Sequence, residues 1–157
     1  MTRKLAALFL VIALIFTLSS CSADNGGTSF VKSEYEEVNV FEGVTLFVKE
    51  GSITPAGLTL VFENAMEAEH IYGSFYCVER KDGDQWFALP YVIKQNVGWD
   101  EMARILPAKG SSEETIDWEW LYGSLNQGEY RIVKELLVMQ EAGDYKKYYL
   151  AAEFVIA

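Results

Sequence analysis

The sequence predicts an all-β protein, built as one antiparallel sandwich or barrel. Short apolar runs recur along the chain with a period of two, which is typical of half-buried strands. Turn residues separate these runs roughly every ten residues, as in sandwiches and barrels. The chain has 157 residues, of which 50% are hydrophobic and 14% aromatic. This is enough for one domain with its own core and excludes wholesale disorder.

A secretory leader precedes the predicted domain. Thr2-Arg3-Lys4 is basic, residues 5–18 carry no charge, and small residues follow; these are the parts of a signal peptide. As a helix, the uncharged segment would reach about 21 Å, which is shorter than a hydrocarbon core of about 30 Å. The sequence therefore predicts a cleaved signal peptide over residues 1–20, not a membrane span.

The end of the leader is more specific. Leu18-Ser19-Ser20-Cys21 resembles the lipobox of bacterial lipoproteins. The resemblance implies that Cys21 is acylated and becomes the first residue of the mature chain, which would attach it to the cell membrane on the extracytoplasmic face. Two or more acyl chains anchor a protein stably. We expect residues 21–42 to form a flexible tether, since 22–29 are small and polar.

The strands that follow can be recognised by the residues that share one face. There are four such sets: Val44, Leu46 and Val48; Leu58, Leu60 and Phe62; Ile116, Trp118 and Trp120; and Tyr148, Leu150, Ala152, Phe154 and Ile156. The third set shows the clearest half-buried pattern, because it alternates with the acidic residues Asp117 and Glu119. Further strands are expected over 72–80, 86–89 and 102–106, with Asp82-Gly83 as a hairpin turn between the first two.

Residues 130–141 fit either a helix or a strand by period alone. The preceding segment, Leu125 to Tyr130, resembles the tyrosine corner of immunoglobulin-like sandwiches, in which a tyrosine hydroxyl bonds to upstream backbone at the start of a strand. The resemblance favours a strand over 130–139, with Tyr130 in this structural role.

Longer stretches extend the resemblance to nearly the whole mature chain, over residues 43–157. They are 43–50, 60–64, 72–75, Ile116 to Gly123 and Gly128 to Glu135. These stretches resemble the bacterial immunoglobulin-like domains of Gram-positive lipoproteins, which are also attached to membrane-bound antibiotic-sensing peptidases. Asn126-Gln127 stands where the corner turn of the family would have proline. The resemblance implies an immunoglobulin-like β-sandwich of about seven to eight strands and supplies no catalytic motif.

The composition of the chain excludes several classes of ligand and site. The net charge is -10, which argues against nucleic acid because phosphate contacts need a cationic face. Cleavage would remove Arg3 and Lys4 from the 13 basic residues and leave 11 against 23 acids. Anionic lipid would repel such a domain, so we expect no tight docking onto lipid. One histidine and two cysteines exclude most zinc and redox sites. We expect no cofactor or structural metal.

The candidate catalytic groups are few. His70 follows an acidic, exposed-looking loop, and we expect a solvated side chain. Cys77 lies in an apolar run, where a buried, inert thiol is typical. Asp117 and Glu119 would share one strand face about 6.8 Å apart, a spacing that could serve glycoside hydrolysis. Other acidic pairs are Asp100-Glu101, Glu113-Glu114 and, as a weak calcium candidate, Asp82 with Asp84.

Aromatic residues offer a binding surface instead. Trp99 lies in a loop-like stretch that follows Tyr91, and exposed loop aromatics anchor protein interfaces or stack on sugars. Trp99 could also fold onto the edge of the sandwich, whereas Trp118 and Trp120 are expected in the core. We therefore expect a non-catalytic, membrane-anchored module that binds an envelope protein or a cell-wall component. The alternative is an exported, carboxylate-dependent hydrolase.

Overall fold

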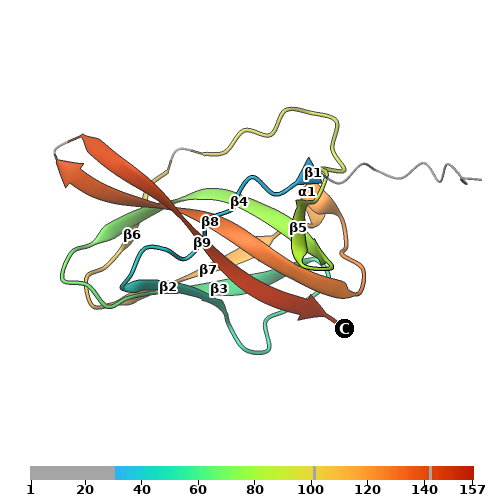
Figure 1. Cartoon of the computed structure of the whole chain (residues 1–157), viewed down its shortest axis with the longest axis horizontal. Coiled ribbons are helices and arrows are strands. Elements are labelled where there is room, and N and C mark those ends of the chain that lie inside the picture. Colours follow the sequence, from blue (N-terminus) through green and yellow to red (C-terminus); the bar gives the residue numbers. More distant parts are fainter. Residues whose placement is uncertain (1–30, 101, 142) are drawn as a thin grey trace, which may run out of the picture.

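The computed structural model describes residues 31–100, 102–141 and 143–157. These residues form nine strands and one short helix (Figure 1). The elements are β1 (Val31–Lys32), β2 (Val44–Val48), β3 (Gly57–Asn64), β4 (His70–Asp82), β5 (Gln85–Ala88), β6 (Arg104–Leu106), β7 (Ser111–Asp117), α1 (Glu119–Tyr122), β8 (Gly128–Glu141) and β9 (Asp144–Ile156). Within the described residues, no helix is long and apolar enough to span a membrane.

Two antiparallel sheets pack face to face. One has the order β2-β3-β7, and the other has the order β1-β5-β4-β8-β9, with β6 also paired to β4. Strand β4 is long enough for its first residues to pair with β6 and its last residues with β5. The arrangement confirms the predicted antiparallel β-sandwich, with nine strands where about seven to eight were expected.

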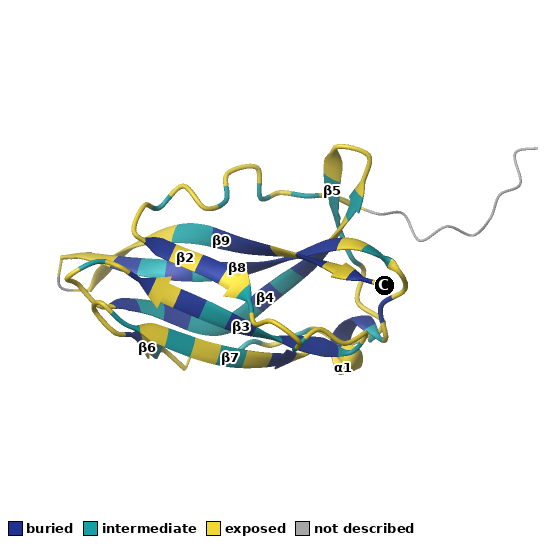
Figure 2. Ribbon diagram, turned by 90° about the horizontal axis from the view of Figure 1, so that it is seen from below, coloured by how far each residue is buried: buried dark blue, intermediate teal, exposed yellow. Residues whose placement is uncertain are grey.

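The core fills the space between the sheets, where dark, buried bands face each other (Figure 2). The alternation read from the sequence is present in β3, whose Leu58, Leu60 and Phe62 are all buried. Trp118 is fully buried as well; its ring stacks 5.4 Å from Phe154, and its Nε1 donates to a backbone carbonyl. The core therefore holds the two sheets together through large apolar side chains.

Residues 128–141 are a strand throughout, paired on both sides with β4 and β9. Near the start of β8, the Tyr130 hydroxyl donates to the Asn126 carbonyl at 2.8 Å. This is the contact that a tyrosine corner makes. The Tyr130 ring also stacks 5.6 Å from Phe154, so the corner is joined to the core.

The strand expected through Trp120 ends earlier, and this part of the prediction was wrong. Strand β7 stops at Asp117, whose Oδ1 accepts the backbone N–H of Glu119 at 3.0 Å. That bond satisfies one of the donors at the start of a helix, and α1 buries Leu121 and Tyr122 in place of the next strand residues. Trp120 is consequently 50% exposed and lies outside the core.

Candidate binding surfaces

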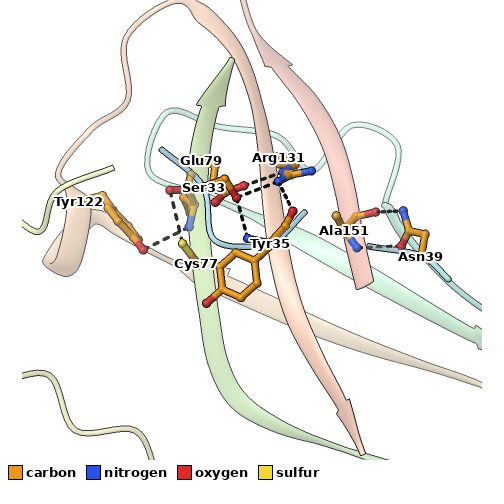
Figure 3. Close-up of polar contacts among 9 residues, drawn as sticks. Ser33, Tyr35, Asn39, Cys77, Glu79, Tyr122, Arg131 and Ala151 are labelled. Carbon is orange, nitrogen blue, oxygen red and sulfur yellow. Dashed lines mark hydrogen bonds and ion pairs between the residues drawn. The ribbon is translucent and has the colours of Figure 1, made fainter. Parts of the chain in front are cut away.

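Residues 31–41, which we call the strap, cross the outer face of the six-stranded sheet. The strap starts in β1, where Val31 is opposite Ala88 of β5, and it runs to the other edge of the sheet (Figures 1 and 2). There the Asn39 amide bonds both the N–H and the carbonyl of Ala151 in β9, at 2.8 and 3.0 Å (Figure 3). One segment is thus bonded to both edges of the same sheet.

A buried ion pair fastens the middle of the strap. Arg131 Nε lies 2.6 Å from Glu79 Oε2, and both side chains are shielded from solvent. The Arg131 Nη2 donates to Ser33 Oγ and to the Tyr35 carbonyl, each at 3.1 Å (Figure 3). The guanidinium also lies 4.7 Å from the ring centre of Trp86. Because a buried charge is tolerated only when it is paired and hydrogen-bonded, the strap completes the environment of Arg131.

The strap buries apolar surface that would otherwise face water. Val133 and Ala151 are buried but do not belong to the core between the sheets, and the Tyr35 ring packs 4.8 Å from Tyr149. The expectation of a tether as far as residue 42 is therefore corrected: residues 31–42 are part of the folded domain. No strap residue is fully buried, and the strap is held by backbone bonds and by Arg131, which is distant in the sequence. The strap therefore shows no alternating pattern of apolar residues.

Cys77 lies on β4 close to the strap (Figure 3). Burial, and secondarily the Glu79 carboxylate, raise the pKa of the Cys77 thiol to about 12. The adjacent N–H of Val78 donates to the Tyr122 hydroxyl. A thiol with such a raised pKa is a poor nucleophile, which agrees with the inert thiol expected at this position.

The other half of the outer face is bare. Ile71 of β4 stands opposite both Ile105 of β6 and Leu137 of β8, and Met139 stands opposite Tyr145. We call these five residues the outer-face patch. Ile105 is 59% exposed and Met139 54% exposed. The register makes them neighbours on one surface, so they form a contiguous apolar patch.

A groove borders the outer-face patch where β4 bulges between Tyr72 and Tyr76. Within it, Ser74 Oγ donates to the Asp100 carbonyl and holds the end of the 89–100 segment against the bulge. Trp99 lines the groove but is half-buried, with its ring 4.9 Å from Tyr76 and 5.4 Å from Phe75. Trp99 was expected either as an exposed anchor on a loop or packed on the edge of the sandwich, and the structure shows the packed position.

A second exposed surface, the end patch, consists of Tyr91, Val92 and Trp120. They are 42%, 59% and 50% exposed. The backbone holds the patch in place: Val92 N–H donates to the Leu121 carbonyl at 2.9 Å, and Trp120 Nε1 donates to the Asp117 carbonyl at 3.0 Å. Sequence reasoning found Tyr91 but missed Trp120. An aspartate before the turn and a glycine after it, Asp117 and Gly123, were the available signals for a helix.

Residues 41–155 match the family described as bacterial Ig-like domain. The chain belongs to this family. The match confirms the immunoglobulin-like assignment of the sandwich. The matched region begins at residue 41, where the strap ends. The strap is therefore a part of the folded domain that the family match does not include. No curated protein matches the chain.

The single histidine of this bacterial Ig-like domain is placed differently from the prediction. His70 is the first residue of β4 and only 3% exposed, with its ring 5.3 Å from Phe41. Burial lowers the pKa of His70, and neither ring nitrogen has a hydrogen-bond partner. The expectation of a solvated side chain was wrong because Phe41, at the end of the strap, covers the ring.

The candidate carboxylate pair of the alternative hydrolase hypothesis is not formed in the Ig-like domain. Asp117 ends β7 and Glu119 begins α1, so they do not share a strand face. Glu114 is instead 2.8 Å from the buried Lys134, and Glu113 is 2.7 Å from the exposed Lys49. No group of three or more histidine, cysteine, aspartate or glutamate side chains could hold a metal ion in the described part of the chain. Cys21 and Glu101 lie outside the described residues.

Proposed function

We propose that this protein is a lipid-anchored, extracytoplasmic accessory module that binds an envelope protein through the outer-face patch. The observation that carries the proposal is the contiguous apolar row Ile105–Ile71–Leu137, set on a rigid sheet and left bare by the strap. Single exposed apolar residues are ordinary, whereas contiguous apolar patches mark interaction sites.

The chemistry of the patch favours a protein partner over an anionic or sugar polymer. Beside the patch, Lys147 is 2.7 Å from Glu135, so these two charges are already paired. The bordering groove adds the exposed Met102 and the edge of Trp99. Methionine adapts its shape to apolar partners. An apolar segment of another protein is the occupant that matches such a surface.

The anchor is supported by the sequence of the leader. A basic start, an uncharged segment and Leu18-Ser19-Ser20-Cys21 resemble a lipoprotein signal. Changing Cys21→Ala should abolish fatty-acid labelling and release the protein from the membrane fraction or leave it as the unprocessed precursor. Labelling and membrane partitioning equal to wild type would contradict the anchor.

The partner surface is tested by cross-linking the full-length protein in its native membrane and identifying what is captured with it. We expect one stoichiometric envelope protein, which is lost when Ile105 and Met139 are both changed to serine. Phe47→Ser is the matched control, because Phe47 is 41% exposed on the other sheet. Captured wall fragments, or a captured protein that survives the double change, would refute the proposed surface.

A further inference from the structure

The strap fixes where the chain leaves the domain. Because residues 31–41 are bound to the sheet, only residues 22–30 separate Cys21 from the fold. Ten residue steps of fully extended chain reach at most about 35 Å. If Cys21 is the point of attachment, Val31 stays within that distance of the membrane surface.

The end patch lies next to this point. Val31 is opposite Ala88, and Tyr91 follows Ala88 by three residues. The Tyr91 ring lies 5.3 Å from Tyr122 in α1, the helix that carries Trp120. Figure 1 shows β1 and α1 at the same end of the molecule, with the turn between β8 and β9 at the other end, and Figure 2 shows α1 and β5, the partner of β1, on opposite sides of that end. The end patch is therefore an exposed apolar surface at the tether end of the domain, where Val31 is also 68% exposed.

Local charge at the end patch differs from that of the whole chain. Between Asp84 and Asp100 the sequence has no acidic residue, and its only charged residue is Lys94. Lys32 of β1 adds a second exposed cation, whereas nearby acidic residues include Glu34 in the strap, Asp100 beside Trp99, and Asp117 and Glu119 around α1. The 85–99 segment therefore adds little to the repulsion that the net charge predicts for an anionic bilayer.

We propose that the end patch docks onto the lipid bilayer to which Cys21 attaches the chain, with Tyr91, Val92 and Trp120 in the headgroup region. Tryptophan and tyrosine are the residues that favour this interface, because their rings are apolar and carry one polar atom. A short tether turns weak docking into an intramolecular event with a high effective concentration. Docking at this end leaves the outer-face patch free for the envelope partner. The inference rests on the proposed lipid anchor.

The test uses the full-length, lipidated protein in phosphatidylcholine vesicles whose acyl chains carry bromine, a short-range quencher of tryptophan fluorescence. Flotation with the vesicles reports the anchor, and quenching reports docking. The variants are made in a Trp99→Phe background, because the Trp99 ring lies 6.4 Å from Trp120 and would be quenched with it. We expect quenching in this background that is lost when Trp120→Phe is added. The control Trp86→Phe should keep it, because Trp86 packs against Arg131. Changing Tyr91 and Val92 to serine should lower the quenching of the retained Trp120.

The outcomes separate the proposed lipid anchor at Cys21 from the proposed docking of the end patch. Flotation without quenching in the wild type overturns docking and leaves the anchor intact, whereas failure to float overturns both. Quenching that persists in Trp120→Phe shows a different membrane-facing surface and overturns the inference. If Trp120 is protected from a water-soluble quencher in native membranes but not in lipid vesicles, a protein covers the end patch, and the inference also fails.

Discussion

The buried ion pair beneath the strap makes a quantitative test of how the strap is held. Arg131→Met would leave the fully buried Glu79 carboxylate without its cation, and Glu79 Oε1 already has no partner. Breaking a buried pair by removing one partner costs about 3–5 kcal/mol. Domains of this size are stable by about 5–15 kcal/mol, so the variant should still fold at room temperature. With a urea dependence of about 2 kcal/mol per molar, the unfolding midpoint should fall by roughly 2 M.

Urea unfolding followed by tryptophan fluorescence at neutral pH is the assay. Lys49→Met is the matched control, because it breaks the pair with Glu113 at a similar distance, 2.7 Å, with both side chains half-exposed. Such an exposed pair contributes about 1 kcal/mol or less. The double variant Glu79→Leu with Arg131→Met should recover much of the loss, since it leaves no unpaired buried charge. The reasoning is refuted if Arg131→Met loses no more stability than Lys49→Met.

Three further predictions concern single side chains. The pKa of His70 is lowered in the folded state, so the unfolded state takes up a proton first as the pH falls below about 6.5. The free energy of unfolding should therefore drop by up to about 1.4 kcal/mol per pH unit. Unfolding measured at several pH values should show this drop in the wild type and not in His70→Leu. The pKa of Cys77, raised to about 12, should slow its alkylation at pH 8 by more than about 100-fold relative to the unfolded chain, as followed by mass spectrometry; equal rates would contradict burial. Tyr130→Phe removes the bond to Asn126 and should cost about 1 kcal/mol in urea unfolding, and an unchanged midpoint would mean that the corner hydroxyl adds no stability.

The strands could be predicted because their burial alternates. In β3 the apolar residues face the core at every second position, and period two is the direct signature of a half-buried strand. Strand β8 has Arg131 and Val133 buried on the outer face as well as Ile132 on the inner one. Its period was therefore ambiguous, and the tyrosine corner was needed to assign it.

The misplaced residues have two different causes. Trp120 continues the alternation of β7, yet Asp117 Oδ1 accepts a hydrogen bond from the N–H of Glu119, and the helix that starts there changes which side chains are buried. His70 has acidic neighbours in sequence, but its environment is set by Phe41, distant along the chain. The strap depends on Arg131, nearly a hundred residues away. The contacts of His70 and of the strap are non-local and leave no local pattern in the sequence, whereas the turn at Asp117 was a local signal that the alternation outweighed.

The strap also has a consequence for how copies of this protein meet. The two-residue strand β1 ends the six-stranded sheet beyond β5, and β9 ends it on the other side. Exposed strand edges are templates for pairing with another chain. β1 pairs with β5, while Asn39 occupies the backbone groups of Tyr149 and Ala151 on β9. Residues 31–39 therefore cover part of the β5 edge and part of the β9 edge at the same time. A chain trimmed to the family boundary at residue 41 would lose both contacts together, and we expect it to associate through these strand edges more readily than the full domain does.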